Sequence, residues 1–365
     1  MPDFKRVIIS GGGTGGHIFP AIAIANTIKR RSSNADILFV GASDRMEMQK
    51  VPEAGYDIIG LWISGLQRKL SLKNVLFPLK VIISIIRSFV ICIKNKPQVV
   101  IGVGGYASGP LLYAASLLGI PTLIQEQNSY AGITNKILAK RVNKICVAFE
   151  KMNRFFPEKK IIFTGNPIRK DIQDVSKLKE ESLKHFGLSQ KKTILVLGGS
   201  LGARSINEAI STNLDFFIEN GLQLIWQTGK NYIEKAQQKL SDQKPNDIKS
   251  MAFIKRMDLA YAAADYVISR AGALSISELC VVKKACILVP SPNVSEDHQT
   301  KNAMALYNNG AALVIKDKEV SVKLKEVLGE LITNRTQKDE LVSNISNMGI
   351  YDADERIVDE IQSLL

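Results

Sequence analysis

Cysteine and histidine are scarce in this chain of 365 residues, which contains four of the first and three of the second. No two cysteines form a Cys-x-x-Cys pair, so we expect no disulfide framework, and the scarcity is typical of a reducing compartment. The cysteines and histidines do not cluster at the spacing of zinc ligands, which disfavours a structural zinc site. The P-loop pattern G-x-x-x-x-G-K-S/T is missing too, which disfavours an ATPase.

Glycine, with 26 residues, and proline, with 12, are too infrequent for a collagen-like or low-complexity chain. Hydrophobic residues make up 45% of the sequence and charged residues 23%, which is the balance of a globular protein. At the usual ~100–200 residues per domain, the length predicts two domains.

Acidic residues are missing altogether between positions 58 and 125. The net charge of +13 comes from the first half of the chain. Residues 1–170 hold 24 Lys and Arg against 9 Asp and Glu, whereas residues 171–365 hold 24 against 26. Inside the acid-free segment lies an apolar stretch, 75–93, which contains Lys80 and Arg87. Further cations flank it: Arg68, Lys69, Lys73, Lys94 and Lys96.

This apolar stretch is at the lower limit for spanning a bilayer, which needs ~20 mostly apolar residues, and charges at bilayer depth are costly. We therefore expect one or two amphipathic helices on an anionic membrane surface, with the cations at the headgroups. The alternative is a buried core helix with a solvated basic face. Nucleic acid is the other common partner of a basic surface. Cations interleaved with Leu, Ile, Val and Phe fit lipid better, so no nucleic acid is expected as a partner.

Short β-branched segments alternate with helical patterns through both halves of the chain. The predicted strands are 6–10, 37–40, 99–103, 122–125, 144–148, 161–164, 193–197, 223–227, 249–253, 266–269, 285–289 and 312–315. The predicted helices include 20–31, 110–118, 203–217, 274–281 and a last amphipathic helix, 353–365. This alternation predicts an α/β protein with parallel sheets covered on both faces, that is, two doubly wound, Rossmann-like domains. Ligands are expected at the carboxyl ends of the strands, in a cleft between the domains.

Both halves begin with a strand, a glycine-rich turn and a helix, at residues 7–17 and 194–204. Turn residues cluster at 164–167, and the residue before a proline is pushed away from the helical conformation. We therefore place the domains at 1–166 and 167–349. The C-terminal helix, about 350–365, is expected to pack back on the first domain.

The first glycine turn, 11–16, formally satisfies the dinucleotide pattern G-x-G-x-x-G after a strand. That fingerprint also requires an acidic residue at the end of the second strand, where Asp44 is the only nearby candidate. The turn runs directly into His17, which we place at a helix N-terminus, where the dipole disfavours the imidazolium. A neutral imidazole beside a cleft is a candidate general base; the alternative is a structural hydrogen bond to the loop.

The second glycine turn, 198–202, offers backbone amides and a helix dipole to a diphosphate without a metal ion. Two polar clusters follow later strands. In the first, Glu278 lies one turn into a helix, where it can accept from a ribose diol; the alternative is a glutamate that stabilises the helix dipole. In the second, Gln299 and Asn302 share a helical face and suit sugar hydroxyls; the alternative is a solvated helix start.

Seven motifs occur in order along the chain. They are Gly12-Gly13-Thr14-Gly15-Gly16-His17 with Phe19-Pro20, Gly104-Gly105-Tyr106, Gln125-Glu126-Gln127-Asn128, Gly165-Asn166-Pro167-Ile168-Arg169, 198–204 with Asn207, 270–278 and 298–303. Together they resemble the peptidoglycan N-acetylglucosaminyltransferases, a family of GT-B glycosyltransferases, from about residue 7 to the last helix. One departure is Gln125, where many members of the family have histidine.

The resemblance implies a first domain that binds a lipid-linked acceptor and a second that binds UDP-N-acetylglucosamine. The implied reaction is inverting transfer of N-acetylglucosamine to the 4-hydroxyl of the N-acetylmuramoyl unit of undecaprenyl-diphospho-muramoyl-pentapeptide (lipid I), giving lipid II. No cofactor and no metal ion are implied. Because lipid I is embedded in the inner leaflet, the resemblance implies a peripheral protein on the cytoplasmic face of the plasma membrane.

The resemblance also implies roles for single residues. His17 is the first candidate for the base that deprotonates the acceptor hydroxyl and Glu126 the second, with Tyr106 and Asn207 as positioning residues. The implied substrate-binding residues are Thr14, Gly15, Gly16, Asn128, Arg169, Ser200, Ile254, Ala273, Leu274, Ser275, Ile276, Ser277, Glu278, Gln299 and Asn302.

Within this set the resemblance implies that Ile254 meets uracil through its backbone, Glu278 holds the ribose and Gln299 reads the sugar. Three other activities remain as alternatives. One is hexosyl transfer to diacylglycerol, and another is epimerisation of UDP-N-acetylglucosamine without a lipid. The third is a nicotinamide-dependent dehydrogenase, which rests on the pattern at 11–16 alone.

Overall fold

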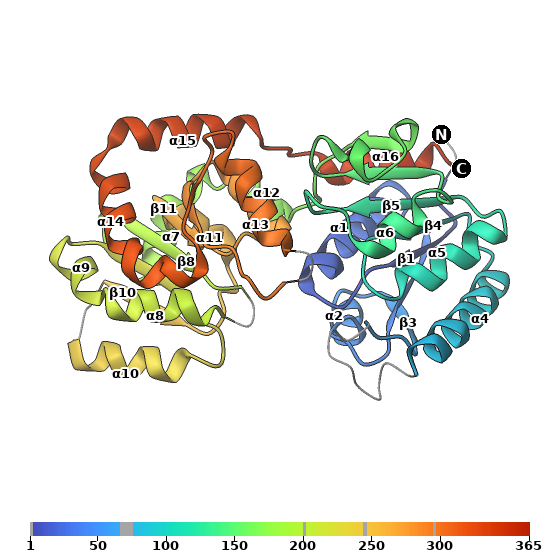
Figure 1. Cartoon of the computed structure of the whole chain (residues 1–365), viewed down its shortest axis with the longest axis horizontal. Coiled ribbons are helices and arrows are strands. Elements are labelled where there is room, and N and C mark those ends of the chain that lie inside the picture. The colour runs from blue at the N-terminus through green and yellow to red at the C-terminus, as the bar shows by residue number, and fades with distance from the viewer. Residues whose placement is uncertain (1–2, 66–75, 200–201, 244–246, 295–296) are drawn as a thin grey trace. The chain divides into compact units, whose positions relative to one another are not determined.

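Two parallel β-sheets organise the chain, one in each of two units (Figure 1). The computed structural model describes residues 3–65, 76–199, 202–243, 247–294 and 297–365. Unit 1 consists of Met1–Ile168 and Asp352–Leu365, and unit 2 consists of Arg169–Tyr351.

The described part of unit 1 contains a seven-stranded sheet whose neighbouring strands are all parallel. Across the sheet lie β3 (Asp57–Leu61), β2 (Asp36–Ala42), β1 (Arg6–Ser10), β4 (Val99–Gly102), β5 (Thr122–Glu126), β6 (Lys144–Val147) and β7 (Ile161–Phe163). Val7, Ile8 and Ile9 of β1 are successive residues, so they point to both faces, and each is at most 1% exposed. Such continuous apolar runs are typical of a parallel sheet covered on both sides.

Helices supply that cover. The described helices of unit 1 are α1 (Gly15–Arg31), α2 (Glu47–Glu53), α4 (Phe77–Asn95), α5 (Ser108–Leu117), α6 (Ile133–Leu138) and α16 (Ala353–Gln362). Apolar side chains of α1 and α16 form a core with one face of the sheet, and those of α4, α5 and α6 form a second core with the other face.

The C-terminal helix α16 is tied to α1 by ion pairs as well as by this apolar core (Figure 1). A nitrogen of Arg30 lies 3.0 Å from a carboxylate oxygen of Asp354 and 2.9 Å from one of Glu355. Nitrogens of Arg31 lie 2.6 Å from oxygens of Glu355 and Asp359. The end of the chain therefore completes one face of unit 1.

In the described residues of unit 2, six parallel strands lie in the order β10 (Ile248–Met251), β9 (Gln223–Gln227), β8 (Thr193–Leu197), β11 (Tyr266–Ser269), β12 (Ala285–Leu288) and β13 (Leu313–Val314). The described helices are α7 (Lys179–Phe186), α8 (Arg204–Thr212), α9 (Leu214–Glu219), α10 (Ile233–Gln243), α11 (Met257–Ala263), α12 (Ala273–Val282), α13 (His298–Tyr307), α14 (Val320–Thr333) and α15 (Arg335–Asn347). In both sheets the first strand is central, and the strand order reverses between the first and fourth strands. The prediction of two doubly wound, Rossmann-like domains is therefore confirmed.

One strand of the structure was not predicted, and two predicted helices differ from it. Strand β3 was not predicted, because it is an edge strand with a charged first residue and an internal glycine. Helix α1 begins at Gly15 and includes Pro20, because the N–H groups of His17 and Ile18 already bond to the Thr14 carbonyl. The single helix predicted at 203–217 is two helices, α8 and α9, because the Asn213 side chain donates to the Ala209 carbonyl at 2.8 Å.

Helix α4 buries Ser84 and Ser88 beside Ile91 and Cys92, and it exposes a row of apolar side chains where an ordinary surface helix is polar. Ser84 and Ser88 are fully buried, and the Ser84 hydroxyl donates to the Trp62 carbonyl at 3.1 Å. Six apolar side chains, which we call the α4 face, are 38–59% exposed: Leu79, Ile82, Ile83, Ile86, Val90 and Ile93. The alternative of a buried core helix is therefore wrong for these positions. Among the described residues, no helix is both long and apolar enough to cross a bilayer.

Candidate active site

The point where the strand order reverses carries a glycine turn in each sheet. In unit 1 this point lies between β1 and β4, which lead into residues 11–14 and 103–107. In unit 2 it lies between β8 and β11, which lead into residues 198–203 and 270–272. Because doubly wound sheets bind ligands at such points, these two places are the candidate sites.

A buried carboxylate holds the first glycine turn. Glu47, the first residue of α2, is 1% exposed. Its two oxygens accept hydrogen bonds from the backbone N–H groups of Gly13 at 2.9 Å and Ala42 at 3.0 Å. A Cβ atom at Gly12 would lie only 2.1 Å from a Glu47 oxygen, so a larger residue there would push the Glu47 carboxylate aside. The amide of Gly13 is thus already bound to an anion of the protein.

His17 lies in the first turn of α1 and is half-buried. Its Nδ1 is 2.9 Å from the side-chain oxygen of Gln127. The ring also lies so close to Gly104 that a Cβ atom there would be 2.6 Å from Nδ1. Gly104 has a φ of +95°, in the region that favours glycine. The second loop is therefore shaped to receive the imidazole.

Glu126, the other predicted base, is fully engaged inside its own loop. It is 2% exposed. One oxygen accepts from the backbone N–H of Asn128 at 3.0 Å and from its side-chain amide at 3.2 Å. The other accepts from the N–H of Gly132 at 2.9 Å and from the amide of Asn135 at 2.8 Å. Glu126 therefore fixes the loop between β5 and α6, together with Asn128.

The remaining predicted residues of unit 1 lie at or beside the first turn. Thr14, Gly15 and Gly16 form the start of α1, where Thr14 is exposed. Tyr106 lies in the second loop, 103–107, and is 45% exposed. It lines an apolar cavity of about 230 Å³ together with side chains of α4, α5 and α6. Unit 1 thus combines the first turn and His17 at the switch point, with Tyr106 in an adjoining apolar cavity.

The second glycine turn approaches β9 closely. Ser200 lies outside the described residues. Gly202 has a φ of +81°, and a Cβ atom there would lie 2.2 Å from the Thr228 carbonyl oxygen. Asn207 is 1% exposed; its amide donates to the same carbonyl at 2.7 Å, and its oxygen accepts from the Trp226 indole at 2.9 Å. Asn207 therefore positions the turn by tying α8 to β9.

Glu278, on α12, is partnered by two other side chains of unit 2. One oxygen accepts from Arg169, with Nη2 at 3.1 Å and Nε at 3.3 Å, and the other accepts from the Tyr261 hydroxyl at 2.9 Å. Burial raises the pKa of the Glu278 carboxyl, and Arg169 and Tyr261 oppose that rise. Burial also raises the pKa of the Tyr261 hydroxyl well above its usual range, so Tyr261 remains a donor. The predicted contacts Arg169 and Glu278 therefore lie together.

Further predicted substrate-binding residues lie on α12 and α13, among them Gln299 and Asn302, which are expected at the sugar. Ala273 to Ser277 form the first turns of α12 and, apart from the buried Ile276, are half-buried. Gln299 is half-buried, and its oxygen accepts from the Ser291 N–H at 2.9 Å. Asn302 is fully buried and donates to the Ala271 carbonyl at 3.4 Å, so it supports the turn before α12.

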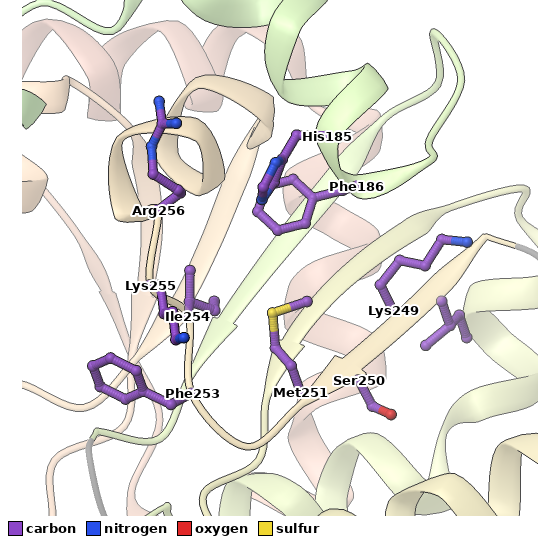
Figure 2. A pocket seen from close by; sticks show the side chains of 10 residues that line it. His185, Phe186, Lys249, Ser250, Met251, Phe253, Ile254, Lys255 and Arg256 are labelled. Carbon is purple, nitrogen blue, oxygen red and sulfur yellow. The ribbon is translucent and has the colours of Figure 1, made fainter.

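Ile254 follows β10 and lines a pocket of about 640 Å³. Figure 2 shows the other lining side chains, among them Phe186 from the end of α7 and Met251 from β10. The backbone N–H of Ile254 donates to the Gln227 side-chain oxygen at 3.0 Å. A uracil that binds through this N–H must therefore displace Gln227.

Four residues of the sites were not assigned a role from the sequence: Glu47, Gln127, Tyr261 and Gln227. Gln127 lies inside a motif, so the sequence places it near the site but does not predict its contact with His17. The other three act across 17–34 residues of chain and leave no local pattern. Among the described residues, no group of three or more His, Cys, Asp or Glu side chains is arranged to hold a metal ion.

Each half of the chain matches a known protein family. Residues 7–147 match the glycosyltransferase family 28 N-terminal domain, and residues 193–357 match the C-terminal domain of the same family. The chain belongs to glycosyltransferase family 28. A family 28 relative from Cytophaga hutchinsonii is 56% identical and one from Flavobacterium psychrophilum is 53% identical, with 100% of this chain and 99% of each relative covered. Both are named UDP-N-acetylglucosamine–N-acetylmuramyl-(pentapeptide) pyrophosphoryl-undecaprenol N-acetylglucosamine transferase.

Two solved structures resemble this family 28 chain over nearly its full length. The crystal structure of Acinetobacter baumannii MurG is 30% identical, with a TM-score of 0.79, and the match covers 98% of this chain and 99% of that one. A UDP-GlcNAc 2-epimerase from Neisseria meningitidis, solved with UDP-GlcNAc, has a TM-score of 0.68 at 14% identity, with 99% of this chain and 100% of that one covered. The second likeness shows a shared fold alone.

Proposed function

We propose that the chain is an inverting glycosyltransferase. It moves N-acetylglucosamine from UDP-N-acetylglucosamine to the 4-hydroxyl of the N-acetylmuramoyl unit of lipid I and forms lipid II for peptidoglycan synthesis. The observation that carries this proposal is the identity of 53–56%, over the full length, to transferases with that name. The position of the motifs at both switch points supports it.

The donor binds to unit 2. Glu278 exchanges part of its bonding to Arg169 and Tyr261 for the ribose hydroxyls, and Arg169 is then available to the diphosphate. The N-terminus of α12, a helix of ten residues, directs its first N–H groups and dipole toward the phosphates. These groups stabilise the departing UDP. Ile254 and Gln299 complete the donor site at the uracil and at the sugar.

The acceptor binds to unit 1, where His17 is the base. The 4-oxygen of the acceptor attacks the anomeric carbon as the bond from that carbon to UDP breaks, and the configuration inverts. The proton of the 4-hydroxyl passes to the imidazole. We prefer His17 to Glu126 because the oxygens of Glu126 already accept hydrogen bonds from four donors.

The α4 face supports our proposal that the protein binds peripherally to the cytoplasmic leaflet of the plasma membrane. Exposed apolar side chains in a contiguous patch mark an interaction surface. Arg87 and Lys94 are exposed on the same helix, and each cation near an anionic leaflet contributes ~1 kcal/mol. The apolar cavity beside Tyr106 adjoins this helix, which supports delivery of a lipid-linked acceptor from the membrane.

The decisive experiment measures UDP release from UDP-N-acetylglucosamine with and without a water-soluble lipid I analogue, and identifies the product by mass. We expect release that depends on the acceptor and a product enlarged by one N-acetylhexosamine. We also expect no loss of rate in EDTA. If EDTA abolishes transfer and magnesium restores it, the proposed metal-free diphosphate site is wrong.

The same assay separates the alternatives. Transfer to diacylglycerol in place of the muramoyl acceptor would support a hexosyltransferase of glycolipid synthesis. Conversion of the UDP-sugar to its epimer without any acceptor would support an epimerase. Binding of a nicotinamide dinucleotide in a titration would support a dehydrogenase.

The membrane proposal is tested with vesicles of anionic and of zwitterionic lipid. The variant Ile82→Asp/Ile86→Asp carries charge on the α4 face and is expected to stay in solution when wild type sediments with anionic vesicles. Val322→Asp is the matched control, since Val322 is apolar and 82% exposed but lies in unit 2. Equal sedimentation of the α4 variant and wild type would contradict the proposal, whereas transfer to a soluble acceptor should survive in all three proteins.

A further inference from the structure

Three buried amide side chains form a chain that ends on His17. Gln127 touches the imidazole directly, Gln125 touches Gln127, and Asn166 touches Gln125. All three are at most 2% exposed. Asn166 lies two residues before the end of the first segment of unit 1, so the three amides connect the end of that segment to the first turn of α1.

The contacts of Gln127 determine which way its amide points. Its nitrogen lies 2.7 Å from the Val103 carbonyl oxygen and 3.3 Å from the Gln125 carbonyl oxygen, and it also contacts the side-chain oxygen of Gln125. All three neighbours are acceptors, so the NH₂ group must lie there. The Gln127 oxygen is left facing Nδ1 of His17 at 2.9 Å.

Gln125 and Asn166 fix the orientation of the Gln127 amide. The nitrogen of Gln125 donates to the side-chain oxygen of Asn166 at 2.9 Å, and the nitrogen of Asn166 donates to the backbone carbonyl of Gln127 at 3.0 Å. Turning any one amide over would place two oxygens or two NH₂ groups against each other. A buried polar group left unpaired in this way is unfavourable, so the three amides act as one directional unit.

We propose that Gln127 is a positioning residue that selects the tautomer of His17, with the hydrogen on Nδ1 and the lone pair on Nε2. The amide oxygen only accepts, so Nδ1 must donate to it. A neutral imidazole has one N–H, and Nε2 is then free of hydrogen and able to take a proton. The inference rests on the proposed function, in which His17 accepts the proton of the acceptor hydroxyl. With the hydrogen on Nε2 instead, that nitrogen could not serve as the base.

The test is the tautomer of His17, read from the ¹⁵N chemical shifts of histidine rings in the full chain. The sequence has only three histidines, so the spectrum is simple, and His17→Ala identifies the signal of His17. We expect wild type to carry the hydrogen on Nδ1. In Gln127→Leu we expect loss of that tautomer, a fall in kcat of about 10- to 100-fold and a donor KM within about two-fold of wild type. Gln223→Leu is the matched control, because it removes another fully buried glutamine, in unit 2.

The outcomes separate the inference from the function on which it rests. A hydrogen on Nε2 in wild type, or an unchanged tautomer in Gln127→Leu, overturns the inference. A His17→Ala variant with normal turnover overturns the assigned base, whatever the tautomer. If Gln127→Leu does not fold, the wild-type spectrum and Gln125→Leu still decide. Loss of the second amide should release Gln127 and yield a mixture of tautomers.

Discussion

In unit 1 the buried carboxylates of Glu47 and Glu126 accept hydrogen bonds from backbone N–H groups and asparagine amides, whereas in unit 2 Glu278 accepts from a guanidinium and a phenol. The partners of Glu47 and Glu126 are the loops themselves. The partners of Glu278 are long side chains, Arg169 and Tyr261, that come from other elements. Glutamate thus binds mainly backbone N–H groups in unit 1, whereas in unit 2 it belongs to a cluster of side chains.

This difference indicates that Glu47 and Glu126 stabilise the loops of a site, whereas Glu278 is available to bind a ligand. Glu126 accepts from four donors and Glu47 holds the N–H groups of Gly13 and Ala42, so moving either carboxylate would leave buried N–H groups without an acceptor. Glu278 is 13% exposed and Arg169 is 39% exposed, so both can reorient toward a ligand without unfolding anything. The comparison predicts that substitutions of Glu47 and Glu126 act on folding, while substitutions of Glu278 act on binding.

The largest effect on kcat is expected at His17, the first candidate for the general base. Glu126, the second candidate, is tested beside it. His17→Ala should lower kcat by ~10²–10⁴ and spare donor affinity, because it removes the general base alone. Glu126→Gln should lower the amount of folded protein but leave the turnover of the folded fraction near normal. Steady-state kinetics normalised to active protein check both, and a collapse of kcat in Glu126→Gln alone would reverse the assignment.

A smaller effect is expected at Glu278. Glu278→Ala removes a charge-assisted hydrogen bond to the ribose, of about 1.5–3 kcal/mol, so the donor KM should rise roughly 10- to 100-fold with little change in kcat. Calorimetry with UDP gives the same loss without turnover. Tyr261→Phe should produce a weaker version of the same change, since Arg169 remains. Unchanged UDP affinity in Glu278→Ala would place the carboxylate outside the ribose site.

The third effect concerns the stability of unit 1. Glu47→Gln cannot accept from both Gly13 and Ala42, because one of them then meets an NH₂ group. The buried N–H left without an acceptor should destabilise unit 1 by about 1–3 kcal/mol. Urea unfolding followed by Trp62 fluorescence, in a Trp226→Phe background, reports on unit 1 alone, since these are the two tryptophans of the chain.

Glu53→Gln is the control for Glu47→Gln. Glu53 lies on the same helix, but its carboxylate is exposed and pairs with Lys50 at 2.6 Å. We expect it to unfold as wild type does. If Glu47→Gln and Glu53→Gln unfold at the same urea concentration, the first glycine turn does not depend on the Glu47 carboxylate. The claim that buried carboxylates stabilise unit 1 would then be wrong.

The sequence predicts the sheets better than it predicts these partners. Strands β1, β8, β9 and β11 match their predicted bounds, because a fully buried parallel strand is a continuous apolar run that is visible locally. Glu47 is not visible in this way, since it reaches Gly13 across 34 residues. A resemblance marks Glu126 and Gln127 side by side as important. Only the hydrogen bonds separate the first, which holds a loop, from the second, which faces His17.

The smallest effect is expected at a half-buried cation in unit 2, Lys284, which a backbone group holds as backbone groups hold Glu47 in unit 1. Lys284 donates to the Ala264 carbonyl at 2.7 Å, and burial lowers its pKa to about 8, with Lys179 adding to the shift and Asp265 opposing it. An unfolded chain keeps this proton up to about pH 10.5. Between pH 8 and pH 10 the unfolded state therefore binds more protons, and this group makes stability rise with pH; below pH 8 the folded state bears the whole unfavourable contribution.

Lys284→Met removes that contribution and should stabilise unit 2 by about 1 kcal/mol at pH 7, part of the gain being offset by the lost hydrogen bond. The advantage should shrink as the pH rises from 8 to 10, because wild type then loses its proton and its penalty. Urea unfolding followed by Trp226 in a Trp62→Phe background measures it. Lys283→Met, an exposed neighbour, should show no such pH dependence. A constant difference between Lys284→Met and wild type across this range would mean that Lys284 is solvated. Unit 2 would then hold its less exposed charges by side-chain partners alone, which would sharpen the contrast with unit 1.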